Sequence, residues 1–382
     1  MKKRILIDAS TVGEKTDGLS QYIISLLKHF PDYSFNRFDF YILVNPGVER
    51  KELKELLKSG KFKVFEYKVA PIGPLRDINM LGFYRKNQGK FDVFHSTSNN
   101  YPLFIKNGIA TIHDISSYLY METPWWTFRI IQRYLNFVIK NSLKKSGSVI
   151  AVSHATKDIV LDTYKIDDKI KNKIEVVYEG WEHIINDDYM QSCEDSNNPY
   201  GSYLFYVGTT RKHKNMKRLL KAFNIAKDKL EPDINLVLSG NDKYLDEEDA
   251  KSIAEINANG KRVILTGFVS KRKLHALFRN ADAFIFPSLC EGFGIPVLES
   301  FYFEKPLLCS NTTSLPEIAG DAAILFDPEN VEDIAKTIVY FYDHPEMAAS
   351  LVQKGRERLK QFSWEKAAKE TIALYERHFA KQ

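Results

Sequence analysis

The chain has 382 residues, which exceeds one ordinary domain and suits two domains of roughly 150–200 residues each. Hydrophobic residues make up 44% and charged residues 27%, a globular composition that excludes disordered, collagen-like and disulfide-stapled proteins. The net charge is a modest +5, and the three cysteines (Cys193, Cys290 and Cys309) have no metal-ligand spacing, so we expect a reduced cytoplasmic setting and no zinc site.

The amino terminus, MKKRILIDAS, has a basic start but only a short apolar stretch, Ile5–Ile7, before Asp8 interrupts it. A signal peptide needs a longer apolar region, and a membrane-spanning helix needs about 20 apolar residues. We therefore expect this segment to be the first strand of a cytoplasmic enzyme, and we expect no membrane-spanning segment.

Short β-branched runs alternate with amphipathic patterns in the first half of the chain. The patterns at Gln21–Phe30 and Thr127–Leu143 predict helices. The runs that predict strands are Arg4–Asp8, Asp39–Val44, Lys63–Val69, Val93–His95, Ile109–His113, Val149–Ser153 and Ile174–Tyr178.

The second half repeats this alternation. Amphipathic patterns at Met216–Leu230 and Lys271–Arg279 predict helices. The runs that predict strands are Tyr203–Gly208, Asn235–Ser239, Val263–Gly267, Ala283–Pro287, Pro306–Ser310 and Ala323–Phe326.

Alternation of strands and helices predicts parallel sheets with right-handed crossovers. Thirteen runs are too many for one compact sheet, and the polar segment Trp181–Ser202 divides them. We therefore predict an α/β protein of two Rossmann-like, doubly wound domains, 1–182 and 183–364. Ligands bind such sheets beyond the carboxyl ends of the strands, so the expected site is a cleft between the domains.

The sharpest local pattern is EGFGIPVLE, from Glu291 to Glu299, between a buried-type strand and a helical run. Gly292 and Gly294 allow a close approach of the backbone to a ligand, and free N–H groups at the helix start favour an anion. The two carboxylates can accept from different hydroxyls of an extended ligand. An ordinary strand–turn–helix junction with surface acids is the alternative interpretation.

This stretch resembles the E-x7-E signature of retaining glycosyltransferases of family 4, which have the two-domain GT-B fold. The resemblance continues along most of the chain. The further similar segments are Thr111–Asp114 (TIHD), Ser153–Lys157, Val176–Glu182, Tyr206–Asn215 (YVGTTRKHKN), Val263–Val269, Ser310–Pro328 and Phe362–Trp364. By this resemblance the first domain binds the acceptor, the second binds a nucleotide-sugar donor, and the C-terminal helix 365–382 packs back on the first domain.

The resemblance assigns Lys214 to the donor diphosphate and makes Asn215 the cap of the following helix. A fixed cation there stabilises the charge that develops on a departing diphosphate. A solvated basic run is the alternative. The chain also departs from the family's pattern, because His213 stands where an Arg usually precedes this Lys, and His is neutral near pH 7 unless shifted. Either Arg211 or Lys212 replaces that Arg, or the phosphate is held more weakly.

The resemblance places His113 near the transferred sugar, with Asp114 orienting its loop, and places a glycine loop containing Gly18 under the donor phosphate. A structural histidine and an ordinary strand–helix turn are the respective alternatives. The implied catalytic residues are His113, Lys214 and Glu291. The implied donor-binding residues are Gly18, Gly208, Arg211, His213, Lys214, Gly267, Phe268, Glu291, Gly292, Phe293, Gly294, Ile295 and Glu299.

In this family the mechanism is front-face: the leaving phosphate assists deprotonation of the incoming hydroxyl, Glu291 contacts sugar hydroxyls and Glu299 accepts from the ribose. The chain contains no Asp-x-Asp, the motif that holds manganese in other glycosyltransferases, so we expect no metal and no cofactor beyond the nucleotide sugar. It also lacks a P-loop motif, a G-x-S-x-G elbow and an opening G-x-G-x-x-G.

The segment Thr123–Lys145 predicts an amphipathic helix with basic residues on its polar side. A core-facing helix and an interfacial helix on anionic lipid both fit this pattern. Residues 1–182 carry 28 Lys and Arg against 20 Asp and Glu, a net +8, which favours peripheral contact with the inner face of the plasma membrane. The basic residues form no nucleic-acid-reading motif, so no nucleic acid is expected.

The stretch Phe94–Leu103 followed by TIHDIS is most similar to bacterial mannosyltransferases. The expected reaction is transfer of a hexose, with mannose from GDP-mannose as the first candidate, to a sugar hydroxyl of a glycolipid or polysaccharide precursor. Two alternatives stay open: a nucleotide-sugar epimerase or hydrolase of the same fold, and a non-catalytic nucleotide-sugar-binding subunit.

Overall fold

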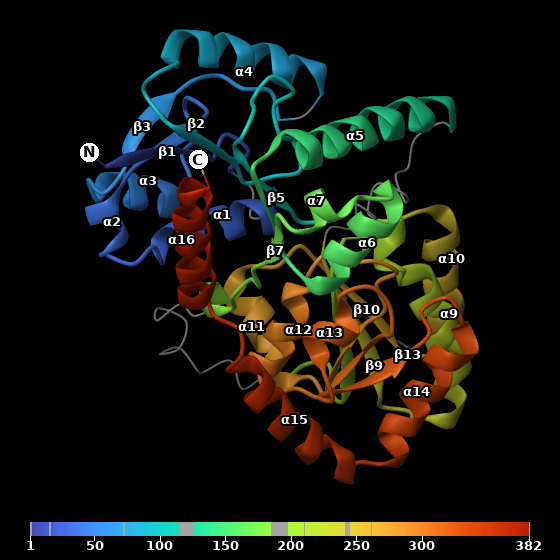
Figure 1. Cartoon of the computed structure of the whole chain (residues 1–382). Coiled ribbons are helices and arrows are strands. Elements are labelled where there is room, and N and C mark those ends of the chain that lie inside the picture. The colour runs from blue at the N-terminus through green and yellow to red at the C-terminus, as the bar shows by residue number, and fades with distance from the viewer. Residues whose placement is uncertain are drawn as a thin grey trace. The chain divides into compact units, whose positions relative to one another are not determined.

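The computed structural model describes residues 2–14, 17–71, 73–114, 125–184, 198–209, 211–240, 245–260 and 262–381. Cys193 and the side chains of Trp125, Trp126 and Phe128 lie outside this description. The chain divides into two compact units (Figure 1). The first unit extends to His183 and resumes at Phe362, and the second spans Ile184–Gln361. The predicted boundaries lie between residues 182 and 183 and between residues 364 and 365.

The first unit is built on one parallel sheet in the order β3-β2-β1-β4-β5-β6-β7. Strands β4, β5 and β6 are buried along their whole length, as expected for a sheet covered on both faces, whereas the edge strand β3 is largely exposed. The strands are β1 (Lys3–Asp8), β2 (Phe38–Val44), β3 (Lys63–Glu66), β4 (Val93–Ser96), β5 (Ile109–Ile112), β6 (Ser148–Ala151) and β7 (Ile174–Val176).

Local side-chain caps fix where several helices of this unit begin. The Asp17 carboxylate accepts from the Ser20 N–H before α1, and the Ser153 hydroxyl accepts from the Thr156 N–H before α6. Pro74 occupies the first turn of α4, where its missing N–H is not needed. The helices are α1 (Gly18–Lys28), α2 (Ser34–Arg37), α3 (Lys51–Lys58), α4 (Pro74–Asn87), α5 (Trp125–Lys145), α6 (His154–Tyr164), α7 (Asp168–Lys171), the turn η2 (Glu182–Ile184) and α16 (Trp364–Ala380).

The second unit has its own parallel sheet, in the order β10-β9-β8-β11-β12-β13. Its strands are β8 (Tyr203–Val207), β9 (Asn235–Ser239), β10 (Val263–Gly267), β11 (Ala283–Phe286), β12 (Leu307–Ser310) and β13 (Ala323–Phe326). Its helices and helical turns are η3 (Lys212–Lys214), α9 (Met216–Ala226), η4 (Lys227–Lys229), α10 (Glu247–Ile256), η6 (Asn257–Asn259), α11 (Lys271–Asn280), α12 (Ile295–Tyr302), α13 (Leu315–Ala319), α14 (Val331–Asp343) and α15 (Glu346–Leu359).

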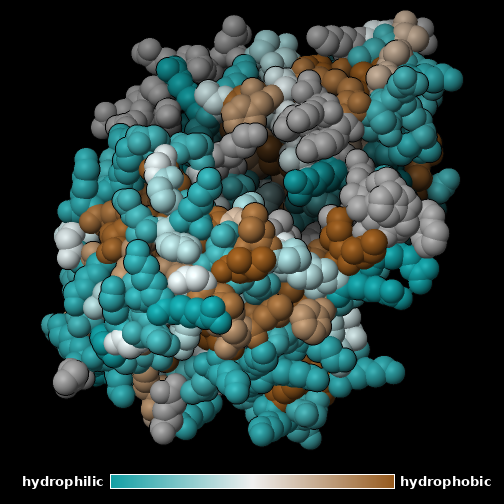
Figure 2. All heavy atoms as spheres, turned by 90° about the horizontal axis from the view of Figure 1, so that it is seen from above, coloured by the Kyte–Doolittle hydropathy of each residue, from teal (hydrophilic) through white to brown (hydrophobic). Residues whose placement is uncertain are grey.

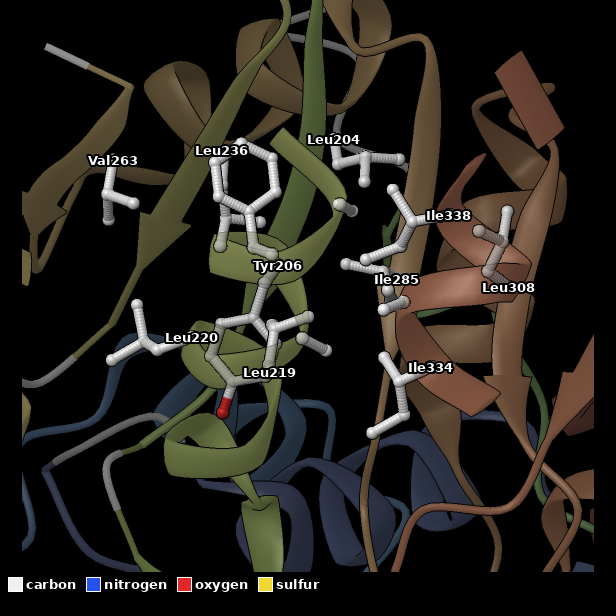
Figure 3. Close-up of a cluster of buried hydrophobic side chains, with 14 of the residues drawn as sticks. Leu204, Tyr206, Leu219, Leu220, Leu236, Val263, Ile285, Leu308, Ile334 and Ile338 are labelled. Carbon is white, nitrogen blue, oxygen red and sulfur yellow. The ribbon is translucent and has the colours of Figure 1, made fainter. Parts of the chain in front are cut away.

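One core cluster of the second unit lies between its sheet and the helices α9 and α14 (Figure 3). Leu204 and Tyr206 of β8 and Ile285 of β11 belong to this cluster with Leu220 of α9 and Ile338 of α14, all of them nearly inaccessible to solvent. Burial of this continuous apolar surface fixes the central strands, and with them the loops at their carboxyl ends.

Both sheets have a point at which the strand order reverses. Strand β1 pairs with β2 on one side and β4 on the other, and β8 pairs in the same way with β9 and β11. The connections that follow run in opposite directions, which opens a ligand crevice beyond the carboxyl ends of these strands. The predicted fold of two doubly wound parallel sheets is confirmed, and each of the thirteen predicted runs forms a strand in the described part of the chain. The predicted cleft between the domains stays a prediction.

The C-terminal helix α16 completes the first unit. The Trp364 N–H donates to Glu182 Oε2 over 2.9 Å, and a Cβ at Gly180 would lie 2.1 Å from the Trp364 nitrogen, so only glycine permits this contact. Tyr375 of α16 reaches the sheet, where its hydroxyl lies 2.6 Å from Nδ1 of His95, a residue of β4. Burial lowers the pKa of His95 to about 3, so this histidine is neutral in the folded protein.

We expect acid to destabilise the first unit through His95. Between pH 6.5 and about 3 the unfolded chain binds a proton at this residue that the folded chain does not, so the free energy of unfolding falls by several kcal/mol as pH falls. All four tryptophans lie at positions that belong to the first unit, so tryptophan fluorescence during acid titration reports on it. His95→Gln should lose this pH slope. Native emission of the unchanged protein down to pH 3 would contradict the prediction.

Candidate functional site

Two charged side chains meet at the carboxyl edge of the second sheet. Lys214 ends the turn η3 that follows β8, and Glu291 lies in the loop that follows β11. Lys214 Nζ lies 2.6 Å from Glu291 Oε1, with side chains only 19% and 15% exposed. Partial burial makes such a pair stronger than one on the surface. The structure therefore brings together two of the three predicted catalytic residues at the β8/β11 crevice.

Glu291 is held by hydroxyl groups on both its side chain and its backbone. The Ser288 hydroxyl donates to the same Oε1 that Lys214 contacts. The Glu291 N–H donates to Thr313 Oγ1 over 3.0 Å, and the Ser314 hydroxyl donates to the Glu291 carbonyl over 3.0 Å. Ser288 belongs to the β11 loop itself, whereas Thr313 and Ser314 belong to the loop after β12. The carboxylate is therefore oriented before any ligand arrives.

Asn215 joins the loops that carry Lys214 and Glu291. It is the N-cap residue of α9, but its side chain does not make the predicted cap hydrogen bond. Its backbone is left-handed (φ 61°), which turns the amide away from the helix N–H groups. The amide instead donates to the carbonyls of Pro287 (3.0 Å) and Pro328 (2.7 Å). The Leu289 N–H donates to the His213 carbonyl over 2.7 Å, which adds a second link between the β8 and β11 loops.

The basic residues before Lys214 are placed differently from one another. The side chains of Arg211 and Lys212 are exposed, whereas His213 is half-buried and its backbone is tied to Leu289. Both exposed cations follow the same strand end as Lys214, so each is positioned to approach an anion bound there. Which of them replaces the family's Arg stays a prediction.

Glycines line the ends of three neighbouring strands of this sheet. A Cβ at Gly240 would lie 1.7 Å from the Gly208 carbonyl oxygen, and the Gly240 N–H donates to the Gly267 carbonyl over 3.0 Å. Gly240 and Gly267 have φ values of +144° and +66°, which other residues rarely adopt. Gly208 and Gly267 are predicted donor contacts, whereas Gly240 is not, although a Ser-Gly pair directly follows the apolar run of β9. Phe268, beside Gly267, is 85% exposed.

The turn before α12 offers a ligand its backbone. Gly294 has φ +100°, and Leu315 lies 2.8 Å from the place a Cβ would take. Phe293 is buried, so its ring belongs to the core, and its carbonyl accepts from the Ser314 hydroxyl over 2.9 Å. Gly292 is also buried and Ile295 begins the helix half-buried. These predicted donor contacts are therefore main-chain positions at a helix N-terminus, which favours anions.

Glu299 lies inside α12 with a largely buried carboxyl group. Desolvation raises its pKa to about 7, and Lys271 opposes that shift only in part. Among the described residues no hydrogen bond or ion pair to this carboxylate is found. A half-buried carboxylate with no partner among the described residues is suited to accept hydrogen bonds from a ligand's hydroxyl groups.

His113, the third predicted catalytic residue, follows β5 in the first unit. Its Nε2 lies 2.9 Å from the Thr97 carbonyl and its Nδ1 lies 3.3 Å from Glu179 Oε1. Both ring nitrogens therefore face acceptors of the protein in this structure. The His113 N–H donates to Asn99 Oδ1 over 3.0 Å, and the Asn99 amide donates to the Asp114 carbonyl, so Asn99 orients the loop.

Gly18 is the first residue of α1, and this helix reaches His113 one turn later. The ring of Tyr22 lies edge-on to that of His113, with 4.4 Å between their centroids. Added Cβ atoms at Gly13 and Gly18 would meet nothing within 4 Å, so the fold itself does not require glycine there. Open space fits a ligand contact and an ordinary turn equally, and the role of Gly18 stays a prediction.

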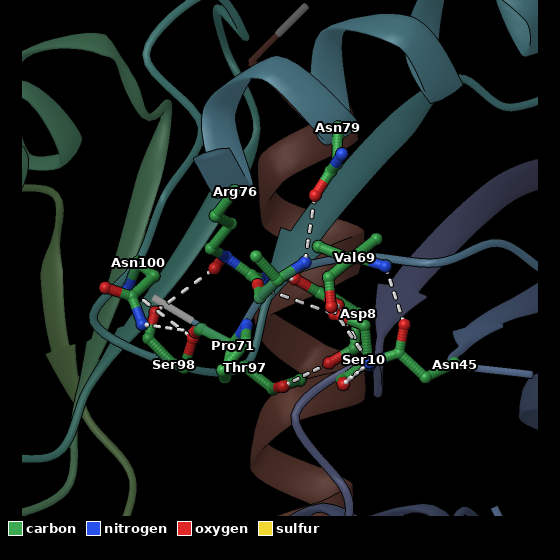
Figure 4. A network of polar contacts seen from close by, with 12 residues as sticks. Asp8, Ser10, Asn45, Val69, Pro71, Arg76, Asn79, Thr97, Ser98 and Asn100 are labelled. Carbon is green, nitrogen blue, oxygen red and sulfur yellow. Dashed lines mark hydrogen bonds and ion pairs between the residues drawn. The ribbon is translucent and has the colours of Figure 1, made fainter. Parts of the chain in front are cut away.

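A buried polar network at the β1/β4 crevice escaped the sequence analysis (Figure 4). Arg76 of α4 forms an ion pair with Asp8 at the end of β1, and its Nη1 donates to the Ser10 hydroxyl over 3.2 Å. The Thr97 hydroxyl donates to the Asp8 carbonyl. Arg76 and Asp8 lie 68 positions apart in the chain, so only the fold brings them together. They fix the strand ends of the first sheet.

Two kinds of feature are absent from the described residues. No three or more His, Cys, Asp or Glu side chains in the described part gather in a way that could hold a metal ion. None of the described helices has the length and apolar character needed to cross a bilayer. The predicted independence from metal stays a prediction.

Two family models match the chain, one for each unit. Residues 16–182 match the model described as Glycosyltransferase Family 4, and residues 195–358 match Glycosyl transferases group 1. The strand ends at which Lys214, Glu291 and His113 lie are inside these matches. The chain therefore belongs to glycosyltransferase family 4, and it is an enzyme of the transferase class.

Similar proteins of known name include two mannosyltransferases. The chain is 28% identical over 296 residues to O-antigen chain mannosyltransferase B of Escherichia coli, an alignment that covers 74% of each chain. It is 25% identical over 344 residues to O-antigen chain mannosyltransferase RfbU of Salmonella typhimurium, covering 85% of this chain and 87% of the relative. The predicted resemblance to bacterial mannosyltransferases is thus confirmed.

Solved structures share the fold over nearly the whole chain. Sucrose-phosphate synthase from Thermosynechococcus elongatus superposes with a TM-score of 0.74 at 16% identity, covering 100% of both chains. Anabaena HepE, solved in complex with UDP and glucose, gives a TM-score of 0.73 at 15% identity, covering 98% of this chain and 100% of HepE. At these identities the likeness shows the fold alone, and it confirms the GT-B architecture.

We expect Glu299 to reduce stability at neutral pH. Its pKa is raised from 4.5 to about 7 on folding, so the unfolded carboxyl loses its proton first and the free energy of unfolding falls as pH rises between these values. The loss should reach about 3 kcal/mol at pH 8. Glu299→Gln should remove it, making the variant more stable than the unchanged protein at pH 8 in urea unfolding.

The matched control is Glu304→Gln, five positions along the same chain segment. Glu304 is exposed and bonded to Arg356, which holds the pKa of Glu304 below its usual value, so this change should not stabilise the protein at pH 8. Equal stability of the Glu299→Gln variant and the unchanged protein at pH 5 and pH 8 would show that Glu299 is solvated.

Proposed function

We propose that the chain is a retaining, metal-independent glycosyltransferase that moves a hexose, with mannose from GDP-mannose as the first candidate, to a sugar hydroxyl of a glycolipid or polysaccharide precursor. The observation that carries this proposal is the Lys214–Glu291 pair at the β8/β11 crevice, a cation and a carboxylate already oriented beside a helix N-terminus. The names of the two mannosyltransferase relatives support the choice of sugar and of a surface-glycan acceptor.

The pair supplies the two charges that the reaction needs. Without a ligand Lys214 and Glu291 neutralise each other. A bound donor offers each a better partner, since its diphosphate attracts the ammonium group and the sugar hydroxyls donate to the carboxylate. As the bond between sugar and diphosphate breaks, negative charge grows on the leaving phosphate, and Lys214 stabilises it. The phosphate in turn takes the proton of the incoming hydroxyl.

The remaining donor contacts follow from the same sheet edge. The N-terminus of α12 presents main-chain N–H groups to phosphate, and the Glu299 carboxylate accepts from the ribose hydroxyls. Arg211 and Lys212 add positive charge at the β8 loop, which suits a diphosphate that no metal ion neutralises. The acceptor binds to the first unit, where His113 lies.

The first test is donor binding without metal. In EDTA, unfolding of the protein is followed by heating with GDP, UDP, dTDP, ADP and their sugars, and a ligand at one hundred times its Kd should add about 2.7 kcal/mol of stability. Lys214→Ala should remove this gain and lower kcat/KM by on the order of 100-fold. The matched control is Lys217→Ala, three positions along, because the Lys217 side chain is 40% exposed and paired with Glu248.

Other outcomes identify the alternatives. Release of an altered or free sugar without any acceptor would indicate an epimerase or hydrolase of the same fold. A folded protein that binds none of the nucleotides would indicate a non-catalytic subunit, and a GDP shift that needs Mg²⁺ would overturn metal independence.

The proposal extends to contact with an anionic membrane through helix α5. Of its predicted apolar face, Leu135, Val138 and Ile139 are buried, as a core-facing helix requires. Two apolar residues outside that face, Ile130 and Phe137, are 63% and 56% exposed. Exposed basic residues surround these two: Arg129, Arg133, Lys140 and Lys144.

Helix α4 adds to the same surface. It exposes Leu75 and Ile78, and its Asp77 accepts a hydrogen bond from Tyr134 of α5 over 3.2 Å. Figure 2, which views the side that carries α4 and α5, shows brown hydrophobic residues among teal hydrophilic ones. Apolar groups that enter the headgroup region while cations bind anionic lipids would hold the enzyme at the cytoplasmic face of the plasma membrane, near a lipid-linked acceptor.

We expect the double variant Ile130→Asp, Phe137→Asp to bind vesicles of mixed zwitterionic and anionic lipid at least about tenfold more weakly than the unchanged protein, because it loses apolar contacts and adds repulsive charge. The measurement is co-sedimentation. The control is Ile225→Asp, an exposed isoleucine of the second unit. Equal binding of the double variant and the control would remove α5 from the proposal.

A further inference from the structure

Glu179 is a buried carboxylate outside the motif positions assigned to the donor. It follows β7 by three residues and is 5% exposed. The next residue, Gly180, lies against Trp364 at the start of α16, which fixes the backbone on that side. A buried carboxylate is unfavourable unless a cation or hydrogen-bond donors compensate it. His113 Nδ1, 3.3 Å away, is the group positioned to do so.

The contacts of the His113 ring determine where its hydrogens are. The Thr97 carbonyl, 2.9 Å from Nε2, can only accept, so Nε2 carries a hydrogen. An ionised Glu179 can also only accept, so a hydrogen must lie between it and Nδ1. The two groups therefore share one proton, which lies between Nδ1 and Oε1.

Two further titratable groups near the ring, Tyr22 and His95, belong to the described residues, and neither competes for this proton. Tyr22 packs its edge against the ring, and burial raises the pKa of Tyr22 above its usual value, so its hydroxyl stays neutral. His95, the nearby histidine of β4, is kept uncharged because burial lowers the pKa of His95 to about 3. Glu179 is thus the charged partner that faces His113 within the described part of the first unit.

We infer that Glu179 is a positioning residue for His113, holding the ring as an imidazolium whose two N–H groups are both bonded to the protein. This inference rests on the proposed function for its catalytic meaning. It removes His113 as a general base or as a hydrogen-bond donor to the sugar. His113 then acts through its fixed charge, with a side chain that is 20% exposed, and Glu179 keeps the charged ring in place during turnover.

The test measures the protonation of the two His113 ring nitrogens directly. Protein labelled with ¹⁵N at histidine gives ring-nitrogen signals, and the His113 signals among those of nine histidines are those lost in His113→Gln. At pH 7 the unchanged protein should show both His113 nitrogens protonated. Glu179→Gln keeps the shape and can donate to Nδ1, so this variant should show the neutral ring with hydrogen on Nε2 only. A neutral His113 in the unchanged protein overturns the inference even if Glu179→Gln does not fold.

The matched control is Glu175→Gln, four positions earlier. Glu175 bonds Arg377 at the surface, so its replacement should leave the His113 signals unchanged. In transfer assays Glu179→Gln should lower kcat about tenfold or more with an unchanged Kd for the nucleotide, which binds to the second unit. Unchanged ring signals in Glu179→Gln refute the positioning role. Absence of turnover in the unchanged protein with every donor refutes the proposed function and leaves the ring spectrum to decide this inference.

Discussion

The arrangement of the donor-side residues depends on one constraint, the position of β8 between β9 and β11 in a wholly parallel sheet. Every strand then ends at the same edge, so residues far apart in the chain meet there. Lys214 and Glu291 are 77 positions apart, yet the strands before them are direct neighbours. The Asn215 amide strengthens this arrangement, because its bonds to Pro287 and Pro328 join the ends of β8, β11 and β13. The loops that carry the two charges are thus placed by backbone geometry.

In the first unit the C-terminal helix has the equivalent role. The ring centroids of Trp364 and Tyr22 are 5.8 Å apart, and those of Tyr22 and His113 are 4.4 Å apart. Three aromatic rings therefore connect the start of α16 with the end of β5. Glu179 reaches His113 from the segment that Trp364 fixes. Packing that seems purely structural therefore sets the environment of a residue assigned to the reaction. Changes in α16 are expected to affect that histidine without touching a substrate.

The sequence predicted the fold because buried parallel strands are unbroken apolar runs, and each such run became a strand. It also identified Lys214 and Glu291, since both follow runs of this kind within recognisable motifs. It did not reveal Glu179, Arg76 or Gly240, whose importance comes from neighbours 66, 68 and 32 positions away. Asn215 shows a different limit: asparagine before a helix usually caps it, but the left-handed backbone here directs the amide elsewhere. The raised pKa of Glu299 could not be predicted from the sequence, because it depends on how far the folded chain removes the carboxyl group from water.

The first unit is discontinuous in the chain, and this affects how the protein is made. Its sheet is synthesised before residue 184, but α16, which bonds His95 and covers Gly180, leaves the ribosome only after the whole second unit. During synthesis the second unit can therefore finish folding first. Until α16 is made, the surface of the first unit that it covers stays exposed. Loss of the last twenty residues would leave that surface exposed permanently. A chain shortened at its carboxyl terminus by truncation or proteolysis is therefore expected to be bound by chaperones.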